Sequence, residues 1–97
     1  MWYTIAYDIV EDRRRNKIAA ILGAYGDRVQ YSVFECELKG DDLKELAGKL
    51  KECLGPKDDS IRIYMICESC KGKMQVLGQG LKMGQQEEEY KRMGWVV

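Results

Sequence analysis

The chain has 97 residues, with 16 acidic and 16 basic side chains and no histidine. This length is typical of one domain. Zero net charge excludes a protein that binds nucleic acid over its whole surface, so any such affinity has to come from local clusters. The absence of histidine excludes a histidine general base, a Cys–His nucleophile pair and a Cys/His zinc site.

No stretch reaches the roughly 20 apolar residues that a membrane span needs. Residues 2–10 run directly into charged sequence and contain Asp8, which is not typical of a signal peptide. We therefore expect a cytoplasmic protein without membrane contact, in which the four cysteines are reduced thiols.

The first two predicted elements are a strand and a helix. Residues 2–9 are rich in aromatic and β-branched side chains and predict a strand that places Asp8 on the face opposite its apolar residues. Asp12 is the expected N-cap of a helix that runs to about Tyr25, where Gly26 ends it.

The rest of the domain repeats this order of strand and helix. Residues 28–38 are extended, as one bent strand or two short ones, because no turn residue marks a break. Asp42 and Glu45 resemble a capping box that opens a second helix. Residues 60–67 predict a strong strand, and residues 73–77 predict a short last one.

This order predicts an α+β fold, a ferredoxin-like sandwich in which an antiparallel sheet carries two helices on one face. The domain covers residues 1–78. Residues 79–97 form a tail rich in glycine and glutamate that ends in an apolar Trp-Val-Val, so we expect this tail to dock onto a partner.

If the helices cover one face of the sheet, the other face carries aromatic and hydrogen-bonding side chains. By strand alternation these are Asp8, Gln30, Ser32, Phe34, Arg62 and Tyr64. Such a face fits an RNA-recognition platform or a dimer interface, and the alternative is a partly solvated sheet surface.

Asp8 is the candidate metal ligand and catalytic residue. Mg²⁺ is held in proteins by one or two carboxylates and keeps several waters, and a twofold dimer brings two copies of Asp8 together. The alternative is a solvated carboxylate that caps the following turn.

Five cations that lie near the start of the first helix are candidates for binding nucleic acid. They are Arg13, Arg14, Arg15, Lys17 and Arg28. Cations in a first helical turn oppose the positive end of the helix dipole, and a phosphate group relieves this conflict. The alternative is a solvated charged face.

Cys67 and Cys70 resemble half of a zinc site. A full site needs Cys36 and Cys53 as well, but Cys53 lies on the buried stripe of the second helix. We therefore expect the Cys67–Cys70 pair to pack at a strand end rather than to bind zinc or serve in redox chemistry.

Several stretches taken together, over roughly residues 1–78, resemble the CRISPR-associated protein two family, the small subunit of the spacer-acquisition complex. They are Tyr7-Asp8-Ile9, Arg14-Arg15-Asn16-Lys17-Ile18, Leu22-x-x-Tyr25-Gly26, Arg28-Val29-Gln30-Tyr31-Ser32-Val33-Phe34-Glu35 and Asp59-Ser60-Ile61-Arg62-Ile63-Tyr64.

The resemblance implies a homodimer in which each C-terminal strand adds to the partner's sheet, and a divalent metal, Mg²⁺, held by Asp8 between the subunits. Some members of the family are described as metal-dependent endoribonucleases on single-stranded RNA, and others as nucleases on duplex DNA. Their general role is to bridge two dimers of the integrase subunit, CRISPR-associated protein one, and to hold the DNA that is inserted.

Hydrolysis of a phosphodiester needs an activated nucleophile and stabilisation of the developing charge. Without histidine, no residue is an obvious general acid, so we expect any nuclease activity to be slow or conditional. Duplex binding needs only cations and backbone contacts. The alternatives are a small ribonuclease toxin of the virulence-associated D type and, ranked lower because no glycine-aromatic strand is present, a plain RNA-recognition module.

Overall fold

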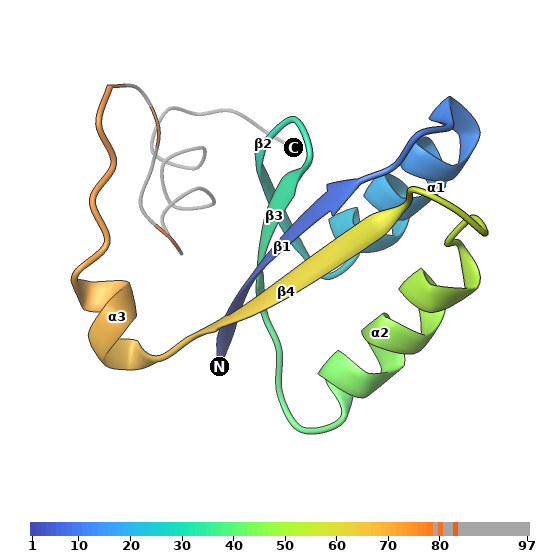
Figure 1. Cartoon of the computed structure of the whole chain (residues 1–97). Helices are drawn as coiled ribbons and strands as arrows, with labels where there is room; N and C mark the ends of the chain where they lie inside the picture. Colours follow the sequence, from blue (N-terminus) through green and yellow to red (C-terminus); the bar gives the residue numbers. More distant parts are fainter. Residues whose placement is uncertain (79, 81–82, 84–97) are drawn as a thin grey trace, which may run out of the picture.

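The computed structural model describes residues 1–78, 80 and 83. Its elements are β1 (Trp2–Asp8), α1 (Asp12–Gly23), β2 (Gly26–Gln30), β3 (Val33–Glu37), α2 (Asp42–Glu52), β4 (Ser60–Ile66) and α3 (Glu68–Gly72). The sheet has the strand order β2-β3-β1-β4, and every neighbouring pair is antiparallel. With α1 and α2 together on one side of this sheet (Figure 1), the predicted α+β ferredoxin-like fold is confirmed.

The hydrophobic core lies between the sheet and the two long helices. Ile5 of β1 is fully buried against Ile18 and Leu22 of α1 and Leu46 of α2. Full burial of such a side chain stabilises a fold by about 1.5–3 kcal/mol. Since one layer of helices covers one face, the opposite face of the sheet is not covered by α1 or α2; we call it the open face.

The extended stretch 28–38 is a hairpin of two strands, β2 and β3, joined by a turn at Tyr31 and Ser32. The pairing register also shifts between Arg28 and Gln30. A turn and a shift of this kind break the two-residue alternation on which face assignments depend.

The break has one clear consequence, which is the position of Phe34. This residue pairs with Ile5, so its side chain points toward the helices, where it is 4 % exposed and part of the core. The prediction that Phe34 belongs to the open face is therefore wrong.

The stretch after β4 also differs from the prediction. Residues 73–77 form no strand in the described part of the chain, and α3 precedes them instead. Cys67 and Cys70, expected to pack at a strand end, both have exposed side chains, so that expectation is wrong. The predicted tail, residues 79–97, lies outside the described residues except for positions 80 and 83. Among the described helices, none is long and apolar enough to cross a membrane.

Candidate functional site

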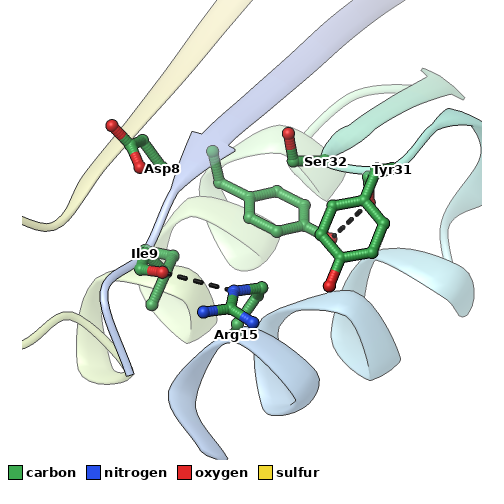
Figure 2. A pocket seen from close by; sticks show the side chains of 6 residues that line it. Asp8, Ile9, Arg15, Tyr31 and Ser32 are labelled. Carbon is green, nitrogen blue, oxygen red and sulfur yellow. Dashed lines mark hydrogen bonds between the residues drawn. The ribbon is translucent and has the colours of Figure 1, made fainter. Parts of the chain in front are cut away.

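Asp8 is the last residue of β1 and pairs with Ser60, the first residue of β4. Its side chain is exposed. Because Ile5 and Tyr7 face the core, alternation places Asp8 on the open face, as predicted. Figure 2 shows its carboxylate directed away from Arg15.

Three other candidate positions also follow the prediction. Arg62 and Tyr64 pair with Ala6 and Thr4, which alternate with the buried residues of β1, so both lie on the open face with Asp8. Gln30 pairs with Val33 beyond the register shift and lies on the same face.

A shallow cavity of about 410 Å³ opens where the end of β1 meets the β2–β3 turn. Its lining comes from β1, α1 and the turn, as Figure 2 shows. The lining residues are Tyr7, Asp8, Ile9, Arg15, Tyr31 and Ser32. Ser32 thus lies at this cavity rather than within a strand. The cavity combines an acid, a cation and an aromatic ring, a set suited to a nucleotide.

Aromatic and cationic groups surround the cavity. The Tyr7 hydroxyl donates to the Tyr31 carbonyl at 3.4 Å and accepts from Arg28 Nη2 at 3.2 Å. The Arg28 guanidinium lies 5.9 Å from the Tyr31 ring centre, and the Tyr31 side chain is 73 % exposed. Tyr31 therefore presents an open ring face that sequence reasoning missed, because the turn that exposes it was not predicted.

Arg15 is held against the end of β1. Its Nε donates to the Ile9 carbonyl and its Nη2 to the Val10 carbonyl, both at 3.3 Å, while its Nη1 lies 2.6 Å from Asp12. The bond to Asp12 raises the pKa of the guanidinium. Arg15 keeps its charge at the cavity, but several of its donors already have partners within the chain.

Arg14 has a different partner, the buried carboxylate of Asp59, which has no exposed side-chain surface. Asp59 accepts from Arg14 Nε at 2.8 Å, from the Val10 amide at 3.1 Å and from the Gly55 amide at 2.8 Å. The Arg14 bond, followed by the two amide bonds, lowers the pKa of Asp59 to about 2. We call these four residues the Asp59 junction.

The junction joins α1, the end of β1 and the loop before β4. A Cβ atom at Gly55 would lie 2.7 Å from Arg14 Cζ, so a larger residue there would make the Arg14 side chain shift from its place beside Asp59. Sequence reasoning gave Asp59 no role, because no local pattern links it to Arg14, 45 residues away.

The other predicted cations are exposed. Arg13 and Lys17 lie on α1 four residues apart, so they share one face of the helix and stand apart from the cavity lining. Arg28 is also exposed, on β2. The predicted cations therefore form two groups. Arg14 and Arg15 make bonds within the fold, whereas Arg13, Lys17 and Arg28 are exposed on a surface that anions can reach.

A metal ion would find few protein ligands in one chain. Across residues 1–78, 80 and 83, no three histidine, cysteine, aspartate or glutamate side chains converge. Asp8 alone, exposed at the open face, suits a Mg²⁺ ion that keeps most of its waters. The Asp8 of a second subunit would add a second carboxylate ligand to the same ion.

The fold and the site define a small α+β protein with an uncovered sheet face and a basic helix start. The family model described as CRISPR associated protein Cas2 matches residues 1–74. The chain belongs to the Cas2 family.

Individual relatives support the same assignment. A protein named CRISPR-associated endoribonuclease Cas2 1, from Chloroflexus aurantiacus, is 43 % identical over 81 residues, which cover 82 % of this chain and 87 % of that protein. The solved structure of a hypothetical protein from Thermus thermophilus is 42 % identical, with a TM-score of 0.74, and the match covers 82 % of this chain and 93 % of that one. A chain of the partial Cas6-RT-Cas1–Cas2 complex is 30 % identical, with a TM-score of 0.73 and coverage of 87 % and 91 %.

Proposed function

We propose that this chain is the Cas2 subunit of a CRISPR adaptation complex, which dimerises, binds duplex DNA and bridges dimers of the Cas1 integrase. The observation that carries the proposal is an exposed sheet face, with Asp8 at its end, in a Cas2 family member. Its likeness to a chain of a complex that contains Cas1 supports the choice of partner.

The single layer of helices supports dimerisation through the open face. A domain of this size buries a modest share of its surface, and a second copy covers the uncovered face. The outer edge of β4 is also unpaired within the described residues, since β4 pairs with β1 alone. That edge has room for the strand that the family resemblance expects from the partner's C-terminal segment.

Duplex binding is assigned first to the exposed cations on α1, Arg13 and Lys17. Backbone contacts of this kind need charge and position but no base recognition. Arg28 extends the basic surface on β2, while Arg14 and Arg15 serve chiefly to hold the helix start in place.

A second activity, Mg²⁺-dependent cleavage of single-stranded RNA, is proposed for the cavity beside Asp8. Asp8 holds the metal ion, which when bound neutralises charge on the phosphate and activates water. Arg15 and Arg28 add positive charge, and the exposed Tyr31 ring offers a stacking surface for an unpaired base. With no histidine as general acid, the reaction is slow.

The nuclease assignment is tested by Asp8→Asn, assayed on single-stranded RNA with Mg²⁺. We expect cleavage to fall at least about tenfold while duplex binding and Tm stay unchanged. Asp58→Asn, which removes an exposed carboxylate elsewhere, is the matched control. Undiminished cleavage by the Asp8 variant rules out its role as metal ligand.

The adaptor assignment is tested by co-purification with Cas1. We propose that residues 79–97 carry the docking segment, so a chain truncated after residue 78 should lose Cas1 but keep its duplex affinity. If the truncated chain retains Cas1 at the same ratio, docking belongs to residues 1–78 instead.

A further inference from the structure

Two cysteines at the end of β4 are close together and accessible. Cys67 follows β4 and Cys70 lies in α3, and both side chains are exposed. The Cys70 amide donates to Cys67 Sγ at 3.4 Å, and the Lys71 amide donates to the Cys67 carbonyl at 2.9 Å. Cys67 Sγ therefore lies against the backbone of the same turn that contains Cys70.

We propose that Cys67 and Cys70 form a reversible intramolecular disulfide, which makes the end of β4 a thiol–disulfide redox site. The two residues lie in one helical turn, which is closed by the hydrogen bond from the Lys71 amide to the Cys67 carbonyl. Residues three apart in such a turn have Cα atoms about 5–6 Å from each other, within the range that a disulfide requires.

The two thiols differ in reactivity. Hydrogen bonds from the Cys70 amide and then from the Cys70 thiol lower the pKa of Cys67. The same contact raises the pKa of Cys70, because its proton is held by the Cys67 sulfur. Cys67 is therefore the attacking thiol and Cys70 the resolving one.

The oxidant is a low-molecular-weight disulfide such as oxidised glutathione. The Cys67 thiolate attacks one of its sulfur atoms, which forms a mixed disulfide and releases one thiolate. Cys70 then loses its proton and attacks the Cys67 sulfur, which releases the second small thiol. Two protein thiols are oxidised to one disulfide, and one small disulfide is reduced to two thiols.

The other two cysteines provide an internal contrast. Cys36 is fully buried, and burial raises its pKa to about 11. Cys53 is buried in the core, where its thiol donates to the Lys49 carbonyl at 3.5 Å. Neither is reactive under conditions that oxidise the exposed pair.

Full-length protein is equilibrated with reduced and oxidised glutathione at a series of ratios, with a metal chelator present, and then alkylated in denaturant. Trypsin releases residues 63–71 as one peptide, whose only cysteines are Cys67 and Cys70. We expect this peptide to lose two hydrogen atoms and both alkyl groups under oxidising conditions, and to regain both thiols on reduction.

Single substitutions test the assigned roles. Cys70→Ser should leave Cys67 as a stable mixed disulfide with glutathione, and Cys67→Ser should slow modification of the remaining thiol by roughly tenfold. The proposal is overturned if the wild-type peptide stays doubly alkylated, if it retains glutathione, or if the disulfide joins two chains on a non-reducing gel. It is equally overturned if only a zinc ion, added without chelator, protects the pair.

Discussion

Arg13 and Lys17 lie next to Arg14 and Arg15 in the sequence, but the two pairs occupy different surroundings. Arg14 reaches Asp59, 45 residues away, and Arg15 is bonded to the end of β1. Arg13 and Lys17 are exposed on another part of α1. A helix turns by about 100° per residue, so consecutive cations cannot share one partner. A basic run thus indicates charge but does not show which side chains are available to a ligand.

The two pairs should therefore respond to different measurements. Loss of the Asp59 carboxylate affects stability, because it leaves Arg14 and two backbone amides without their acceptor. Loss of an exposed cation affects binding to a polyanion and its salt dependence.

The largest expected effect is that of Asp59→Ala. The substitution removes the acceptor for Arg14 and for two backbone amides, and we expect it to lower Tm by about 10 °C or more. Thermal unfolding followed by circular dichroism gives the comparison. The control is Asp58→Asn, which removes an exposed carboxylate from a position with φ of 65°, a conformation that asparagine tolerates. Equal Tm values for the two variants would contradict the role of the junction.

Lowering the pH should reduce stability by a smaller, graded amount, because it protonates the Asp59 carboxylate. Hydrogen bonds in the junction depress the folded-state pKa of Asp59 to about 2, from an ordinary value of 3.8. Its contribution to stability is complete above the ordinary value and is lost as the pH falls toward 2. The stability gap between wild type and Asp59→Asn, measured in urea from pH 5 to pH 2, should therefore narrow below about pH 4. A gap independent of pH would mean that folding does not shift the pKa of Asp59.

Replacement of both Arg13 and Lys17 by alanine should weaken duplex binding by roughly ten- to hundredfold near 0.1 M salt. The slope of log affinity against log salt should fall by about 1.8, with Tm unchanged. Lys44→Ala with Lys51→Ala, which removes two exposed charges from α2, is the matched control. Similar losses in both double variants would show that net charge, rather than the start of α1, determines affinity.

The smallest effect is expected at an exposed network between α2 and Tyr25, which follows α1. The Tyr25 hydroxyl donates to Glu45 at 2.9 Å, and Lys49 lies 3.3 Å from the same carboxylate. Because exposed pairs contribute little, Glu45→Ala should change Tm by less than about 3 °C. If Glu45→Ala lowered Tm as much as Asp59→Ala does, the exposed pair would contribute as much to stability as the Asp59 junction, which would contradict this comparison.

Much of the fold and part of the site could be predicted from the sequence. The positions of Asp8, Arg62 and Tyr64 on the open face follow from alternation within uninterrupted strands. Phe34 could not be placed, because the turn and the register shift before it change the phase of the pattern.

Contacts between residues far apart in the sequence could not be predicted for a different reason. The strand predicted at residues 73–77 rested on local propensity, but a strand also needs a partner, and these residues pair with no strand in the described part of the chain. The bond between Arg14 and Asp59 depends on the path of all the residues between them, and helical periodicity contains no information about that path.

The large sequence separation between Asp59 and its partners has a consequence for folding kinetics. The contacts of Asp59 with Val10 and Arg14 close loops of 49 and 45 residues, so they require β1, α1 and the loop before β4 to meet. Closure of long loops has a high entropic cost before native contacts compensate for it. We expect the junction to form after the transition state, so Asp59→Ala should accelerate unfolding and leave the refolding rate nearly unchanged. The lifetime of the native state, rather than the speed with which it is reached, depends on this one carboxylate.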